Sequence, residues 1–420
     1  MTSFLSQMNM DLRSWFVFRE VRVISKSTSM IIDPIRFGVA GLGRGFSLTA
    51  PSALNSQFVK FVAAVAPREE SRIAFIKAFG GQVYASFDDL IFDDEIEAIH
   101  IATPHQMHAQ MTIKAAEAGK HVLVEKPIAI SLKDAKKMVD SCASNNVVLI
   151  VGPAHSFDAP ILTAKQLLEK KEFGSLLSIN TMNYTDFLYR PRRDEELRTE
   201  DGGGVLFSRG AHQFDIIRFL SGSEALQVFA YTGRWDQDRN TEVSYQALIK
   251  FENGVTAQCT YSGYGHFDSD ELQDWISETG YAKDPMSYGR SRKALIGISR
   301  DEELEAKRKR TFDVKNVPPV ALSNEHFGPL FVQCERADLR IGPTGIAVYG
   351  DFEKKFIAVP MISAPRNPVL EAVYNAVRFD KRPIQSGRWC IGTLELCHAV
   401  LTSSNTGQPV NLNGSKKISY

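Results

Sequence analysis

Two residues that can move protons, Lys126 and His212, stand in segments whose patterns predict a functional site. Lys126 lies in Glu125-Lys126-Pro127, directly after an apolar run at 121–124 that is typical of a buried parallel strand. The carboxyl ends of such strands are where open α/β sheets build their sites, and the proline ends strand pairing there. An ammonium group at that edge could bind a hydroxyl group and help to remove its proton.

His212 follows a glycine-rich turn and begins an amphipathic helical pattern that continues to Leu220. On a helix, Ser208 and His212 are four residues apart and share one face, with Asp215 one turn further along. A histidine there could carry a proton away from a substrate hydroxyl. For the histidine taken alone, a capping or core role is an equal alternative.

Glycines at positions 41 and 43 follow a predicted strand and precede a predicted helix, the context of a dinucleotide-binding turn. Arg44 and Gly45 continue the turn, and the third glycine of G-x-G-x-x-G would stand at Phe46, so the match is partial. Gly41 and Gly43 would let the backbone approach a pyrophosphate, whose charge the helix amino end stabilises. A tight turn without a ligand is the alternative.

The end of the second predicted strand bears on the choice between NAD and NADP. An NAD site carries an acidic residue there, about 20 residues after the glycine turn. This chain has Ala66, Pro67 and Arg68 instead, which favours a 2′-phosphate and therefore NADP. Glu69 and Glu70 follow directly and could still reach a ribose, so NAD stays open.

A loop after the third predicted strand adds candidates at the same sheet edge. Thr103, Pro104 and His105 follow that strand, and His108 lies one turn into the next helix. We expect the rigid loop to line the nicotinamide pocket. For each histidine alone, capping or packing is the more common role.

Arginines cluster in a predicted loop that follows the strand expected at 177–184. Arg190, Arg192 and Arg193 follow Tyr184 closely, and guanidinium groups in a loop can bind carboxylates in a fork geometry. A solvated turn is an equal alternative.

These candidates need a fold that brings them together, and strand–helix alternation up to residue 152 supplies it. The alternation predicts a doubly wound parallel sheet, a Rossmann domain at 33–152. The expected strands are 35–40, 58–66, 96–102, 121–124 and 147–151, and the expected helices are 69–79, 105–118 and 132–145.

After residue 152 the pattern changes to alternating polar and apolar residues, which predicts a large open, mostly antiparallel sheet in an α+β domain at 153–365. We interpret the polar stretch 266–325 as a long excursion, a lid or a dimer arm. Helices within 366–420 should pack back on the core, and residues 1–32 should be a disordered extension. The expected elements are a helix at 160–171, strands at 177–184, 225–232, 241–251 and 255–262, and helices at 371–379 and 391–403.

Composition limits the classes of partner. Among 420 residues, Lys+Arg and Asp+Glu both number 49, so the net charge is zero and offers no footprint for nucleic acid or an anionic membrane. The five cysteines are scattered without a C-x-x-C pair, and no spacing argues for a metal site. We therefore expect a cytoplasmic protein that acts on a small molecule.

Four segments together resemble the Gfo/Idh/MocA oxidoreductase family: 38–43, 102–108, 119–127 and 210–215. The resemblance implies a Rossmann domain with NAD(P), a second domain whose open sheet often mediates homodimers or homotetramers, and catalytic roles for Lys126 and His212. Glu125 would belong to the cofactor site. Members that act on sugars often carry an aspartate where this chain has Ser208.

Three more segments, 183–193, 261–270 and 334–340, resemble the phthalate cis-dihydrodiol dehydrogenases within that family. This implies oxidation of a ring cis-diol to a catechol, with the arginines at 190–193 holding substrate carboxylates. Tyr184, Ser208 and Asp215 would complete the substrate site. The alternatives are a sugar or polyol dehydrogenase, a carbonyl reductase, or a regulator that senses NAD(P) without turnover.

Overall fold

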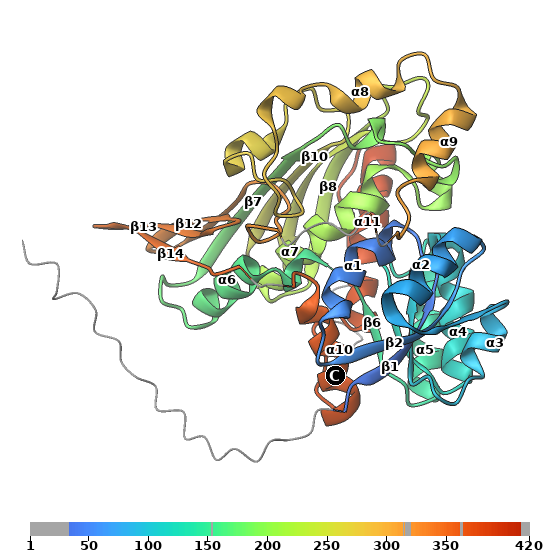
Figure 1. The fold of residues 1–420 in the computed structure, drawn as a ribbon. Coiled ribbons are helices and arrows are strands. Elements are labelled where there is room, and N and C mark those ends of the chain that lie inside the picture. The colour runs from blue at the N-terminus through green and yellow to red at the C-terminus, as the bar shows by residue number, and fades with distance from the viewer. Residues whose placement is uncertain (1–32, 153, 314, 316–320, 362–363, 413–420) are drawn as a thin grey trace, which may run out of the picture. The chain divides into compact units, whose positions relative to one another are not determined.

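Six parallel strands form the first sheet of the computed structural model, which describes residues 33–152, 154–313, 315, 321–361 and 364–412. The expected extension at 1–32 lies outside these residues. The strand order is β3-β2-β1-β4-β5-β6, with the chain crossing between β1 and β4 as a doubly wound sheet requires (Figure 1). The strands are β1 (Ile35–Ala40), β2 (Val59–Val65), β3 (Gln82–Tyr84), β4 (Ala98–Ile101), β5 (His121–Val124) and β6 (Leu149–Val151).

Apolar runs explain why these strands lie at the centre of the sheet. Val122, Leu123 and Val124 are each at most 1% exposed, because helices cover both faces of a parallel sheet. Serine caps begin two of the helices, with Ser86 and Ser131 each accepting from a backbone N–H in the first turn. The helices are α1 (Arg44–Leu54), α2 (Glu69–Phe79), α3 (Phe87–Ile91), α4 (His108–Glu117) and α5 (Leu132–Ser144).

Nine strands form the second sheet, in the order β14-β13-β12-β11-β7-β10-β9-β8-β15. The pairings are antiparallel except between β7 and β10, which run parallel, so the prediction of a mostly antiparallel sheet is confirmed. The strands are β7 (Leu176–Tyr184), β8 (Ala225–Gly233), β9 (Ser244–Phe251), β10 (Thr256–Ser262), β11 (Leu330–Cys334), β12 (Ala337–Gly342), β13 (Gly345–Gly350), β14 (Lys354–Ala358) and β15 (Val410–Asn411).

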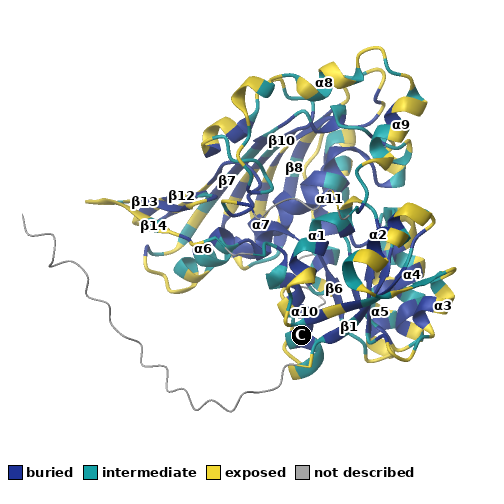
Figure 2. Cartoon of the chain, viewed as in Figure 1, coloured by how far each residue is buried: buried dark blue, intermediate teal, exposed yellow. Residues whose placement is uncertain are grey.

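Helices pack on one face of the second sheet and leave the other face open. Along β9, buried and exposed residues alternate, as expected for a strand with one covered face (Figure 2). The covering helices are α6 (Ala159–Glu169), α7 (Ala211–Ser221) and α11 (Gly387–Thr406), of which α11 packs on β8. Another helix, α10 (Asn367–Phe379), contacts α1 beside the first sheet.

The polar excursion contains two short helices, α8 (Arg290–Leu295) and α9 (Arg300–Arg308), which the weak periodicity did not predict. A capping box of Ser299 and Glu302 begins α9. Figure 1 shows α9 above α2, and Arg68, directly before α2, donates from its Nη1 to the Arg308 carbonyl oxygen at the end of α9 at 3.0 Å. In the part of the chain that the structure describes, no helix is both long and apolar enough to cross a membrane.

Candidate active site

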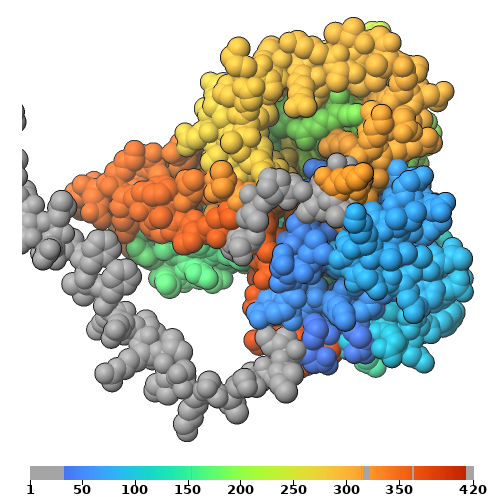
Figure 3. All heavy atoms as spheres, in the orientation of Figure 1, coloured from blue at the N-terminus to red at the C-terminus, as the bar shows by residue number. Residues whose placement is uncertain are grey.

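A cavity of about 1160 Å³ lies at the carboxyl ends of β1, β4 and β5. Figure 3 shows a hollow between the first-sheet residues, in blue, and the excursion, in yellow and orange, with residues from near the middle of the chain, in green, inside it. Most of the predicted site residues line this cavity, namely Gly41, Gly43, Arg44, Gly45, Arg68, Thr103, Pro104, His105, Glu125, Lys126, Arg190, Arg192, Arg193, Ser208 and His212. The sheet edge therefore gathers segments that are far apart in sequence.

Lys126 is held in the cavity by one hydrogen bond from its side chain. Its Nζ donates to the Ser208 carbonyl oxygen at 2.8 Å, which leaves two N–H groups for another acceptor. Burial, followed by the nearby Arg209 cation, lowers the pKa of Lys126 to about 8. The peptide bond between Lys126 and Pro127 is cis. The side chain is therefore mostly an ammonium group at neutral pH, but close to its titration point.

His212 is a buried neutral base beside that ammonium group. Burial lowers its pKa well below the ordinary value, and the charges of Lys126 and His155 act in the same direction. Its Nδ1 has no hydrogen-bond partner among the described residues. The ring packs against His155, with 4.7 Å between ring centroids. A neutral imidazole in this position can accept a proton from a bound hydroxyl group.

His155 belongs to a charged network that sequence reasoning did not assign to the site. Its Nδ1 pairs with Asp158 at 2.7 Å and its Nε2 with Glu278 at 3.4 Å. Burial disfavours the charged ring, but these two carboxylates outweigh it and raise the pKa of His155 to about 9. Glu278 also forms an ion pair with Arg209, so a network of charged side chains lies beside His212. The network contributes to keeping His212 neutral.

Arg209 is the missed residue with the plainest sequence signal, since it follows Ser208 directly. Its Nε donates to the Tyr261 hydroxyl at 3.1 Å, and its guanidinium lies over the Phe327 ring at 4.6 Å. Glu278 comes from the excursion, and no local pattern ties that segment to the site. The pairing of these two residues joins the excursion to the floor of the cavity.

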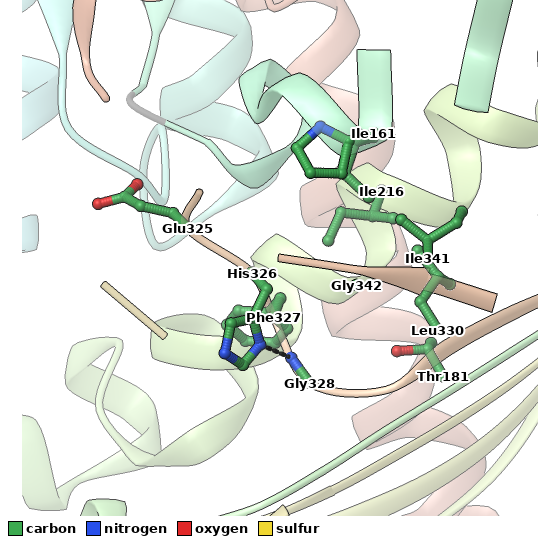
Figure 4. Close-up of a pocket in the computed structure, with 11 residues that line it drawn as sticks. Ile161, Thr181, Ile216, Glu325, His326, Phe327, Gly328, Leu330, Ile341 and Gly342 are labelled. Carbon is green, nitrogen blue, oxygen red and sulfur yellow. Dashed lines mark hydrogen bonds between the residues drawn. The ribbon is translucent and has the colours of Figure 1, made fainter. Parts of the chain in front are cut away.

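A smaller pocket explains how Phe327 is placed. Figure 4 shows this pocket under the turn 325–328, lined by apolar side chains such as Ile161, Ile216 and Leu330. The His326 Nδ1 accepts from the Gly328 backbone N–H at 3.0 Å, which fixes the turn. Phe327 then packs on His212, with ring centroids 5.2 Å apart.

The glycine turn has the shape that a dinucleotide would require. Gly41 has a φ of +92°, and a Cβ there would lie 2.8 Å from the Ala102 carbonyl oxygen. A Cβ at Gly45 would lie 2.9 Å from Glu125 Oε1. At Gly43 a Cβ would meet only the Ala102 oxygen at 3.8 Å, so the missing side chain leaves room on the cavity side. The turn and the free amino end of α1 therefore fit a pyrophosphate.

Basic and polar side chains surround the end of β2, where the adenosine ribose of a dinucleotide would bind. Arg68, Ser71 and Arg72 line the cavity there. Arg72 donates to the backbone oxygens of Ala66 and Pro67, which orders the loop. Ser71 and Arg72 were not predicted, because they lie within α2 and not directly after the strand.

Four predicted residues do not line this cavity. The Phe46 side chain is fully buried among aromatic rings, including Phe61 at 5.5 Å, so only its backbone belongs to the turn. His108 is fully buried too, and its ring nitrogens bond the backbone oxygens of Pro127 and Thr103. The structure therefore gives no support to a cofactor contact by either side chain. Both instead support the loops on which the site is built.

Tyr184 and Asp215 are the other two predicted residues that do not line this cavity, although Asp215 lines a smaller pocket together with Lys126 and His212. The Tyr184 ring packs near Phe267 rather than toward Lys126. Asp215 is buried and bonds the Ser156 hydroxyl and the Trp389 Nε1, the latter at 2.6 Å, behind His212. The one-turn spacing placed Asp215 correctly on α7, but its side chain points into the packed interior.

The three loop arginines line the cavity but differ in how free their charges are. Arg192 and Arg193 both form ion pairs with Glu196, at 3.5 and 3.3 Å, so their charges are largely neutralised within the protein. Lys307 also pairs with Glu196, at 2.7 Å. Arg190 has only an ion pair of 3.5 Å with Asp186. It is the member of the three that is best placed to meet a ligand.

One group of possible metal ligands lies beside the site. The donor atoms of His155, Asp158 and Glu325 lie within 4.8 Å of one another. They are already engaged, since His155 and Asp158 bond each other and Glu325 pairs with Arg366 at 3.3 Å. We assign no metal to this group.

Comparison with known proteins decides the family. The model described as "Oxidoreductase family, NAD-binding Rossmann fold" matches residues 35–153, and the one for the GFO/IDH/MocA C-terminal domain matches residues 161–275. The chain belongs to the Gfo/Idh/MocA oxidoreductase family. This confirms the resemblance drawn from the four motifs, and the Gfo/Idh/MocA chain is an NAD(P)-dependent dehydrogenase.

Individual relatives cover most of the chain. A 1-carboxy-3-chloro-3,4-dihydroxycyclohexa-1,5-diene dehydrogenase of Comamonas testosteroni is 40% identical over 374 residues, which is 87% of this chain and 94% of the relative. A D-xylose 1-dehydrogenase (NADP(+)) of Haloferax volcanii is 27% identical over 246 residues, 58% of this chain and 73% of the relative. A crystal structure of a Bordetella bronchiseptica protein classed as a dehydrogenase is 36% identical, with a TM-score of 0.85, and covers 90% of this chain and 100% of its own.

Proposed function

We propose that this Gfo/Idh/MocA enzyme oxidises a carboxylated cis-dihydrodiol to a catechol with NAD(P)⁺. The observation that supports it most is the pairing, in one cavity, of the Lys126 ammonium with the neutral base His212. The substrate class rests on the 40% identical relative, whose name describes a carboxylated dihydroxycyclohexadiene dehydrogenase. The excess of basic side chains in the cavity fits the carboxylate.

The chemistry is a two-electron oxidation of one carbinol. The Lys126 ammonium donates a hydrogen bond to the substrate hydroxyl oxygen, using an N–H that the Ser208 carbonyl leaves free. His212 takes the hydroxyl proton as the C–O bond gains double-bond character. Nicotinamide, when bound, supplies the hydride acceptor. The ketone formed from a ring cis-diol then shifts one proton from carbon to oxygen and becomes aromatic.

For the cofactor we propose NADP in preference to NAD. Where an NAD enzyme has an acidic residue this chain has Ala66, and three side chains that can bind phosphate, Arg68, Ser71 and Arg72, line the same end of the cavity. The Arg68 Nη1 already donates to the Arg308 carbonyl oxygen at 3.0 Å, which orients its guanidinium at the cavity wall.

Substitution of Lys126 tests the proposed roles. We expect Lys126→Ala to lower kcat for diol oxidation by about 10²- to 10⁴-fold, the range typical of a lost acid–base group. NADP⁺ should bind with the wild-type affinity in calorimetry, because the glycine turn is untouched. Lys136→Ala, an exposed lysine of α5, is the matched control. A Lys126→Ala enzyme with turnover within a few-fold of wild type would sink the assignment.

Three alternatives remain testable with the same assay. A sugar or polyol dehydrogenase is favoured by the D-xylose relative, but Ser208 stands where sugar-acting members often carry aspartate. A panel of cis-dihydrodiols, sugars and ring ketones would separate a diol oxidation from a sugar oxidation and from carbonyl reduction. Binding of NADP⁺ without turnover of any panel member would instead support a cofactor sensor.

We also propose that the chain forms a homodimer or homotetramer through the open face of the second sheet. Large apolar side chains are exposed there, with Leu248 58% and Tyr231 56% exposed on β9 and β8. The five cysteines are free and buried, which suits a reducing compartment such as the cytoplasm. Light scattering of the wild type and of Leu248→Lys would test the assembly.

A further inference from the structure

Residues 300–312, which we call the strap, join the two halves of the molecule beside the cavity. The strap consists of α9 and the turn that follows it. At its start, Glu303 accepts from the Arg192 backbone N–H and from Arg239 Nη2, both at 2.9 Å. At its end, the Phe312 backbone N–H donates to the Leu42 carbonyl oxygen at 3.1 Å. One end therefore belongs to the arginine loop and the other to the glycine turn.

Phe312 anchors the strap to the core of the first sheet. Its side chain is 2% exposed and packs on Phe46, with ring centroids 5.1 Å apart, and on Phe79 at 6.0 Å. In the middle, Lys307 pairs with Glu196. The strap is thus held by apolar packing at one end and by ion pairs at the other, and its position along the cavity wall is well determined.

The cavity that the strap borders is strongly cationic although the whole chain is neutral. Twelve lysine and arginine side chains and five carboxylates belong to its lining. Most of the cations have a carboxylate partner, but within the described residues no carboxylate pairs with Arg44 or Arg310. Arg68, Arg72 and Lys126 likewise have no carboxylate partner among the described residues, but each donates to a backbone oxygen. Arg44 and Arg310 are therefore the cations of this lining that are best placed to bind an anion.

Arg310 of the strap lines the cavity together with two arginines from other segments. Arg44 comes from the glycine turn and Arg190 from the arginine loop, and all three line the same cavity. Burial lowers the pKa of Arg310 to about 10, and repulsion by Arg44 and Arg190 adds to this effect. Three like charges gathered from three segments, with one weak internal partner, form a concave anion site.

We propose that Arg310, together with Arg44 and Arg190, binds the carboxylate of the substrate. The inference rests on the proposed function and names the residues that select an anionic diol. We choose a substrate carboxylate over a cofactor phosphate because of where the three arginines lie. All three arginines line the same cavity as His212, so the held anion would lie in the cavity that contains the proton acceptor.

The dinucleotide has other groups to bind its phosphates. The amino end of α1 serves the pyrophosphate, and Arg68, Ser71 and Arg72 serve the far end of the cavity. Arg190 and Arg310 both lie outside the stretch 35–153 that matches the NAD-binding family model. A carboxylate beside a reacting ring is therefore the anion that this cluster fits best.

The test measures binding directly, by calorimetry on the full chain saturated with NADP⁺. The probes are 3,4-dihydroxybenzoate, a product analogue with a carboxylate, and catechol, the same ring without one. We expect wild type to prefer the carboxylate, and Arg310→Ala to weaken 3,4-dihydroxybenzoate by about 10- to 100-fold, as for a lost charged hydrogen bond. Its affinity for catechol and NADP⁺ should change less than about twofold, within the error of such comparisons.

Two further variants separate binding from folding. Lys309→Ala removes an exposed charge from the neighbouring position and should leave both probes unaffected. Arg310→Lys keeps the charge and should recover part of the lost affinity. Thermal denaturation checks each variant, and Arg310→Ala without ligand should be no less stable than wild type because it removes like-charge repulsion.

Every outcome decides the assignment. Equal wild-type affinity for the two probes, or an unchanged preference in Arg310→Ala, overturns it. A loss of NADP⁺ affinity in place of 3,4-dihydroxybenzoate affinity also overturns it and gives the cluster to the cofactor. If the carboxylate preference depends on Arg310 but no cis-dihydrodiol is oxidised, the anion site stands and the proposed reaction falls.

Discussion

The rate of diol oxidation should fall above about pH 8, because Lys126 loses its proton there. Burial and the Arg209 cation lower the pKa of Lys126 to about 8 from an ordinary value of 10.5. In the proposed reaction the ammonium form donates to the substrate oxygen, so the protonated enzyme is the active one. The sign follows directly: as pH rises through about 8, active enzyme is lost.

The size of the effect follows from the titration of one group. At pH 9, about one enzyme in eleven keeps the ammonium, and kcat/KM should then fall about tenfold for each further pH unit. An acidic limb near the ordinary histidine value of 6.5 should be missing, because burial and nearby cations hold the pKa of His212 well below it. The profile should therefore be a plateau with one alkaline limb.

Two variants assign the limb to Lys126. Lys126→Arg keeps a cation that does not titrate in this range, so its residual activity should show no alkaline limb. Arg209→Gln removes a neighbouring cation that lowers the pKa of Lys126, so the limb should move to higher pH. Initial rates of NAD(P)H formation at saturating cofactor give kcat/KM, and circular dichroism at each pH checks folding.

Opposite behaviour would refute this reasoning in a recognisable way. A rate that rises through pH 8 would mean that neutral Lys126 is the base and that the roles of Lys126 and His212 are exchanged. A flat profile up to pH 10 in wild type would mean that the charge of Lys126 does not matter for hydride transfer. A limb that persists in Lys126→Arg would assign the titration to another group.

Two further outcomes test the cofactor end and the strap. Arg68→Ala should weaken NADP⁺ binding by about tenfold and leave NAD⁺ within about twofold, because only NADP⁺ carries the 2′-phosphate; equal losses in calorimetry would contradict the phosphate role. Phe312→Ala should lower the free energy of unfolding by about 3 kcal/mol through loss of buried aromatic packing, measured by urea denaturation. Phe312→Ala should also raise KM for the diol. The control Phe312→Leu should keep the free energy of unfolding and the KM close to their wild-type values. An unchanged KM in Phe312→Ala would show that the strap does not shape the site.

Periodicity was enough to predict the sheets, because burial on one or two faces imposes it on each strand. Short elements escaped, since Gln82–Tyr84 and Phe87–Ile91 are too brief to show a period. The parallel pairing of β7 with β10 was also missed. Both strands read as ordinary alternating segments, and the direction of pairing depends on tertiary connections that no local pattern records.

Residue type and position singled out Lys126 and His212 as candidates, and the structure places both in the lining of one cavity. The arginine loop shows the limit of that reasoning. Arg192 and Arg193 form ion pairs with Glu195 and Glu196, which follow closely in sequence, and our sequence reasoning did not predict these pairs. Arg310 lies more than a hundred residues from that loop, and only the fold brings it to the cavity.

The zero net charge of the chain excluded nucleic acid and anionic membranes as partners in our sequence reasoning, yet it concealed the property that matters most at the site. Charge summed over 420 residues says nothing about where cations gather. The structure concentrates cations in a cavity and leaves Arg44 and Arg310 without carboxylate partners among the described residues. Unpaired like charges held close by the fold destabilise it unless an anion binds, so the cluster is more readily explained by a ligand than by stability. A neutral chain with a cationic cavity fits the two anionic ligands of the proposed reaction, a dinucleotide and a carboxylated ring.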